Sequence, residues 1–156
     1  PLCGPTAPSL DGQLFFVCPG RDGRWLGWLK GWLHRAGARV VQMPAADHDR
    51  LMAQVQSLRH MLLLGLGSTL LEVGFDPARD LPLAGPWFGS LMELLERQGG
   101  QPAQLYADLA LNNPEAPRVL TVLADNLARI ARLTAAGDRQ GLVELMDRVQ
   151  GFLDQG

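Results

Sequence analysis

The fold of this chain is decided by residues 47–60, which read Asp-His-Asp-Arg-Leu-Met-Ala-Gln-Val-Gln-Ser-Leu-Arg-His. Apolar residues recur there at helical spacing and continue to about Glu72, and Asp47 is a residue type that caps helix N-termini. The first half of this predicted helix is amphipathic, whereas the second half is apolar nearly all round. We therefore expect the second half to be enclosed by protein on every side, partly by a second subunit.

The residues before this helix have the pattern of a small α/β unit. Residues 14–18 form a short apolar run that is typical of a strand buried on both faces, and residues 38–43 alternate like a second strand. Between them, residues 22–36 carry a helical apolar stripe. Three tryptophans at helical spacing are expected in the core: Trp25, Trp28 and Trp32. One strand–helix–strand unit is too small for a nucleotide-binding domain, so we predict that residues 1–44 are the C-terminal remnant of one.

The residues after Pro44 predict helices only. Further helices are expected at about 86–98, 102–112, 114–136 and 138–154. Their boundaries are marked by Asn113-Pro114 and Gly137-Asp138, which are typical helix caps. The predicted fold class is therefore mainly α, with a short α/β remnant (1–44) followed by a helical dimerisation domain (45–156).

The composition excludes several classes of function. The net charge is −2 and Lys30 is the only lysine, so nucleic-acid binding is unsupported. Apolar runs such as Met61 to Leu64 are far shorter than a membrane span, and no signal peptide is expected from the first residues. Two cysteines make no disulfide framework. We expect a cytoplasmic protein, and a chain that begins at Pro1 suggests a fragment.

Two apparent sites have plainer interpretations. Residues 65–70, Gly-Leu-Gly-Ser-Thr-Leu, imitate a dinucleotide fingerprint, but they continue a helix and put Leu70 where a small residue is needed. Close helix packing is the better interpretation. His48 and His60 are separated on one helix by about 18 Å and about 120°. They cannot share an ion, and we predict no metal site.

Segments along nearly the whole chain resemble the prephenate dehydrogenase family of tyrosine biosynthesis. Residues 46–60 and 104–108 resemble its helical dimerisation domain. Residues 1–5 resemble the loop after a core strand of its nucleotide-binding domain, and residues 16–21 and 32–38 resemble the end of that domain.

The resemblance implies an oxidative decarboxylation of prephenate that uses NAD or NADP. In that family a histidine takes the substrate hydroxyl proton while hydride leaves for nicotinamide, and an arginine holds a carboxylate. His48, Gln56 and His60 stand at matching positions. With Gly4 and Arg97 they make up the substrate-side candidates, and a small aromatic acid is the implied ligand.

The departures from the family pattern leave two hypotheses open. The catalytic histidine would fall just before Pro1, and the glycine-rich nucleotide loop is missing, so we expect no cofactor bound by this chain. Where the family has an arginine for the substrate, this chain has Gly89, and Arg97 lies about 12 Å further along the helix. The chain is either the C-terminal part of such a dehydrogenase, inactive by itself, or a non-catalytic dimeric helical protein that binds a small aromatic acid or a protein partner.

Overall fold

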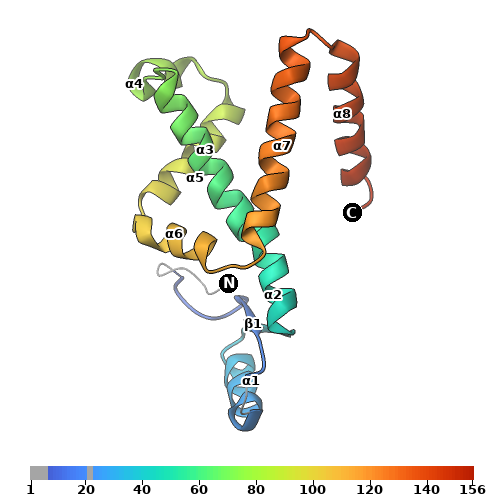
Figure 1. Cartoon of the computed structure of the whole chain (residues 1–156). Coiled ribbons are helices and arrows are strands. Elements are labelled where there is room, and N and C mark those ends of the chain that lie inside the picture. Colours follow the sequence, from blue (N-terminus) through green and yellow to red (C-terminus); the bar gives the residue numbers. More distant parts are fainter. Residues whose placement is uncertain (1–6, 21–22) are drawn as a thin grey trace. The chain divides into compact units, whose positions relative to one another are not determined.

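The computed structural model describes residues 7–20 and 23–156, and the expected Gly4 position lies outside them (Figure 1). The protein is mainly helical with one small α/β portion, as the sequence predicts. Its contacts divide it into two units, Pro1–Ala116 and Pro117–Gly156, each of which is described by itself. The division expected between residues 44 and 45 stays a prediction.

The α/β portion consists of two parallel strands and one helix. Strand β1 (Leu14–Val17) pairs with β2 (Arg39–Gln42), and Leu14 lies opposite Arg39. The connection between them contains a short 3-10 turn, η1 (Gly23–Trp25), and helix α1 (Leu26–Arg35). A small core forms where α1 meets the strands, from Val17, Leu33 and Ala38. Parallel strands need such a crossover, which explains the element order.

The placement of the three tryptophans in the core is wrong. Trp25, Trp28 and Trp32 are 63%, 60% and 44% exposed, whereas Leu33 on the same helix is 3% exposed. Only one face of α1 meets the two strands, and Leu33 occupies that face. Trp25 and Trp28 instead contact each other edge to face, with ring centroids 6.3 Å apart.

The long helix is present but departs from the expectation in two ways. It begins at Ala45 rather than at Asp47, whose carboxylate lies in the first turn and accepts a hydrogen bond from Arg50 at 3.0 Å. It also consists of three consecutive pieces: α2 (Ala45–Met52), the π-helical turn η2 (Ala53–Ser57) and α3 (Leu58–Glu72). Within this chain α3 is buried on one side only, since Leu63 is 6% exposed and Leu64 is 53% exposed.

Two short elements that the sequence did not predict, α4 (Pro77–Asp80) and η3 (Leu81–Leu83), lead from α3 to α5 (Pro86–Gly99). Helix α5 packs against α3, and α6 (Ala103–Leu111) packs against the π-helical turn. The contact of α3 with α5 is close at Gly67, where an added Cβ would lie 3.2 Å from a Leu95 methyl group. Gly67 therefore serves helix packing, as the sequence indicates.

The second unit is a hairpin of α7 (Ala116–Ala135), whose first residue falls in the first unit, and α8 (Arg139–Leu153). Gly137 adopts a positive φ of 64°, and the Asp138 side chain caps α8 by accepting from the Gly141 N–H at 2.9 Å. Both features follow the caps read from the sequence. Asn113 similarly accepts a hydrogen bond from the Glu115 N–H, just before α7.

Among the described helices, no single one is long and apolar enough to cross a membrane. Residues Ala45–Glu72 and Pro77–Leu83 have the length and apolar composition of a membrane span only when they are counted together. The chain bends by 95° between these two parts.

Candidate functional site

The π-helical turn changes which residues share a face of the long helix. In a straight α-helix, His48 and His60 would differ by about 120° in direction. A π-helical turn contains about one more residue than an α-helical turn, which offsets about 100° of this rotation. The two histidines then differ by only about 20° in direction. Both histidines accordingly lie on the α6 side: His48 shares a hollow with Leu105, and His60 contacts Tyr106.

His48 and Gln56 line one hollow of about 240 Å³ between the long helix and α6. His48 Nδ1 lies 3.0 Å from a carboxylate oxygen of Asp49, and its ring meets that of Phe16 edge to face at 5.9 Å. The side-chain amide of Asn113 donates to the Asp49 carbonyl oxygen at 2.9 Å, which ties the segment after α6 to α2. The other lining residues are Met52, Leu105, Asp108, Leu109 and Asn112.

His60 and Arg97 line a second hollow, of about 230 Å³, together with Arg59 and Tyr106. The remaining lining residues are Leu63, Leu94 and Gln98. Arg59 and Arg97 are exposed residues, and none of the described residues that line this hollow is acidic. The hollow is therefore cationic and suits an anionic group such as a carboxylate, which a guanidinium can bind through two parallel hydrogen bonds.

His60 is 7% exposed, and each of its ring nitrogens has a polar partner. Its Nδ1 lies 2.9 Å from Gln98 Oε1 and its Nε2 lies 3.0 Å from Arg59 Nη2, while the Tyr106 ring centroid is 4.4 Å away. Burial lowers the pKa of His60 below 6.5, the Gln98 hydrogen bond opposes this shift, and the Arg59 charge lowers the pKa further. His60 is thus held neutral near pH 7.

The structure separates Gly89 from this hollow and places Arg97 in it. Gly89 lies in the first turn of α5, where an added Cβ would meet nothing within 4 Å. Arg97 lies in the last turn of α5 and lines the same hollow as His60. Of the two positions, Arg97 is the one that can reach a ligand beside His60.

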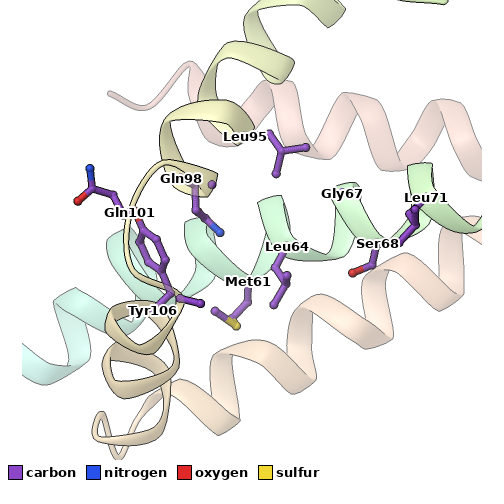
Figure 2. A pocket seen from close by; sticks show the side chains of 11 residues that line it. Met61, Leu64, Gly67, Ser68, Leu71, Leu95, Gln98, Gln101 and Tyr106 are labelled. Carbon is purple, nitrogen blue, oxygen red and sulfur yellow. The ribbon is translucent and has the colours of Figure 1, made fainter. Parts of the chain in front are cut away.

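A third hollow, of about 430 Å³, is an apolar groove that shares Gln98 and Tyr106 with the cationic hollow (Figure 2). Its apolar lining comes from α3 and from the end of α5. The lining residues are Met61, Leu64, Gly67, Ser68, Leu71, Leu95, Gln98, Gly99, Gln101, Ala103 and Tyr106. Figure 2 shows Met61 and Leu64 on α3, with Leu95 on the neighbouring helix. We refer to this surface as the α3–α5 groove.

The sequence pattern found the histidines but missed three of their partners. Arg59 precedes His60 and Tyr106 is the only tyrosine, so both were visible as unusual residues. Gln98 gave no signal, because it lies 38 residues from His60 along the chain. No group of three or more His, Cys, Asp or Glu residues that could hold a metal ion occurs within residues 7–20 and 23–156.

Comparison with known proteins decides the family. The family model described as the prephenate dehydrogenase dimerization domain matches residues 44–148 of this chain. The chain belongs to the prephenate dehydrogenase family. It is 30% identical over 149 residues to a probable arogenate/prephenate dehydrogenase of Methanocaldococcus jannaschii, covering 94% of this chain and 33% of that protein. It is 33% identical over 125 residues to a 4-amino-4-deoxyprephenate dehydrogenase of Streptomyces pristinaespiralis, covering 80% of this chain and 41% of that protein.

The fold is shared with solved structures of the family. A prephenate dehydrogenase from A. aeolicus, solved with hydroxyphenyl propionate and NAD+, matches with a TM-score of 0.69 and 22% identity, covering 90% of this chain and 49% of that chain. A Synechocystis arogenate dehydrogenase matches with a TM-score of 0.63 and 21% identity, covering 91% of this chain and 51% of that chain. The chain thus spans about a third to two fifths of the curated relatives above and about half of the solved chains.

Proposed function

We propose that residues 1–156 form the substrate-side, helical part of an NAD(P)-dependent dehydrogenase that oxidatively decarboxylates prephenate or a close relative such as arogenate, and that they are inactive alone. The observation that carries this proposal is the cationic hollow beside His60, in a chain whose helices match the family. The same proposal places the protein in the cytoplasm, with a role in tyrosine biosynthesis.

The cationic hollow supports a role in binding a substrate carboxylate. Arg97 and Arg59 offer two guanidiniums on one hollow, and the Tyr106 ring and Leu94 supply an apolar wall. Hydrogen bonds between a guanidinium and a carboxylate are roughly twice as strong as those between neutral groups. The hollow that contains His48 and Gln56 carries carboxylates instead, so we assign those two residues to the remainder of the substrate.

Residues 7–20 and 23–156 do not fit a dinucleotide. The described portion has one pair of parallel strands, and its Gly-Leu-Gly segment lies inside α3, where Gly67 packs against Leu95. Parallel sheets are normally covered on both faces, yet three residues of β2 and the tryptophans of α1 are exposed. We therefore propose that residues 1–44 are completed by further strands of a Rossmann-type domain, which binds NAD or NADP.

We also propose that the protein is a homodimer, with the α3–α5 groove as part of the interface. The matching family model describes a dimerization domain. Leu64 and Leu71, both on this groove, are 53% and 82% exposed. Large exposed apolar surfaces in soluble proteins mark interaction sites, and a second copy would cover this one.

Calorimetric titration of residues 1–156 with prephenate, with and without NAD+, tests the assigned role. We expect saturable prephenate binding that NAD+ does not alter, NAD+ binding no better than to a control protein, and no turnover. Arg97→Gln should weaken prephenate binding at least about tenfold, which is about 1.4 kcal/mol, while Arg148→Gln on α8 should not. Micromolar NAD+ affinity would contradict the proposal, as would prephenate binding that is insensitive to Arg97→Gln.

Gly89 favours a second candidate, a non-catalytic dimeric helical protein that binds a small aromatic acid or a protein partner. The family resemblance places an arginine at this position, and the space around Gly89 is open. A dimer that binds hydroxyphenyl propionate but not prephenate would favour this candidate over the first.

A further inference from the structure

The side chain of Gln98 forms two hydrogen bonds with His60. Its Nε2 donates to the His60 backbone carbonyl at 3.0 Å, and its Oε1 lies 2.9 Å from His60 Nδ1. A backbone carbonyl can only accept, so the amide nitrogen must face it and the amide oxygen must face the ring. An amide oxygen also only accepts, and this requires the ring proton to be on Nδ1.

The second ring nitrogen is assigned by the same reasoning. Arg59 Nη2 lies 3.0 Å from His60 Nε2, and a guanidinium can only donate. Nε2 must therefore present a lone pair, so the neutral Nδ1–H tautomer is the only form that satisfies all three contacts. In the protonated ring, an N–H at Nε2 would point at the Arg59 guanidinium.

The tautomer of His60 also affects the cationic hollow. On the side of the long helix, Arg59 accompanies His60, while Arg97 faces the hollow from α5 and Tyr106 from α6. These are the titratable groups that line the hollow besides His60 itself, and none of them is acidic. A long exposed arginine side chain is otherwise free to sample many rotamers, and fixing one costs conformational entropy. The lone pair of His60 Nε2 fixes the Arg59 guanidinium before a ligand arrives.

We propose that Gln98 is a positioning residue that sets the His60 tautomer and, through His60, holds the Arg59 guanidinium at the cationic hollow for an anionic group. The anionic group is a carboxylate of a small aromatic acid, and this part rests on the proposed function. Gln98 also lines the hollow, but both ends of its side-chain amide are bonded to His60 and are not available to a ligand. It acts by deciding which nitrogen of His60 is an acceptor.

The tautomer of His60 is measured first, without any ligand, by nitrogen-15 NMR at pH 7.5 on protein whose histidine side chains carry nitrogen-15. We expect His60 to show a protonated Nδ1 and an unprotonated Nε2. Gln98→Leu should abolish the preference for this tautomer, while Gln101→Leu, a matched change on the same groove, should leave it unchanged. Gln98→Glu should raise the pKa of His60, because a carboxylate favours the charged ring.

Binding is then measured by calorimetry with hydroxyphenyl propionate as the probe. Gln98→Leu should weaken binding about tenfold and Gln101→Leu less than twofold, with Arg59→Gln as weak as Gln98→Leu. A wild-type His60 that is charged or protonated on Nε2 overturns the proposal, even if no Gln98 variant folds. So does an unchanged tautomer or unchanged probe binding in Gln98→Leu. If the tautomer responds as expected but the wild type binds neither probe nor prephenate, the substrate-side function fails while the tautomer assignment stands.

Discussion

Leu71→Arg should dissociate the proposed homodimer. Leu71 lines the α3–α5 groove and is 82% exposed, so nearly its whole side chain is available for burial by a partner. Full burial of a leucine side chain contributes about 1.5–3 kcal/mol. Because 82% of Leu71 is available for burial and each substitution acts twice in a twofold dimer, the loss is about 2.5–5 kcal/mol, or at least about 70-fold in the dissociation constant. An arginine that becomes buried there without a partner would weaken the dimer further.

Sedimentation equilibrium over a range of protein concentrations measures this effect. Leu111→Arg is the matched control, because Leu111 is also 82% exposed but does not line the groove. Leu63 is not a suitable probe, since it is 6% exposed within its own chain and a charge there would unfold the monomer. A Leu71→Arg dissociation constant within about threefold of wild type, or a wild type that is monomeric at micromolar concentration, would refute the assignment of this groove to the interface.

Two further predictions concern stability. Because the pKa of His60 is lowered in the folded state, the unfolded chain binds the proton more tightly, so the free energy of unfolding should fall as the pH falls below 6.5. The decline should continue until the pH is below the folded pKa, and His60→Gln should remove this part of the pH dependence in urea unfolding measured at several pH values. Gly37→Ala should destabilise the protein by about 1–3 kcal/mol, because Gly37 has a φ of +78° and an added Cβ would lie 2.2 Å from an Asp11 carboxylate oxygen. Gly27→Ala, in open space on α1, should stabilise it by about 0.5–1 kcal/mol, and equal effects of the two changes in thermal unfolding would contradict this reasoning.

The helix boundaries were largely predictable because their signals are local. Gly137 and Asp138 mark a cap that depends on residues within one turn, and the structure has both the positive φ and the side-chain cap. Asp47 misled for the same reason: its carboxylate is suited to capping, but Pro44 precedes Ala45 and the helix begins there instead. The exposed Trp28 shows that apolar periodicity does not reveal whether a partner surface is present.

Residue order and local spacing were enough to predict the family, the mainly helical class and the helix that carries His48 and His60. Only the tertiary structure placed a π-helical turn in that segment and brought both histidines to the side of α6. It also joined His60 to Gln98 and placed Arg97 beside them. Gln98 and Arg97 lie 38 and 37 residues after His60 in the chain, and their positions beside it depend on how α5 and α6 pack against the long helix. Packing sets the hydrogen-bond geometry between side chains that are distant in sequence, and it leaves no periodic pattern in the sequence.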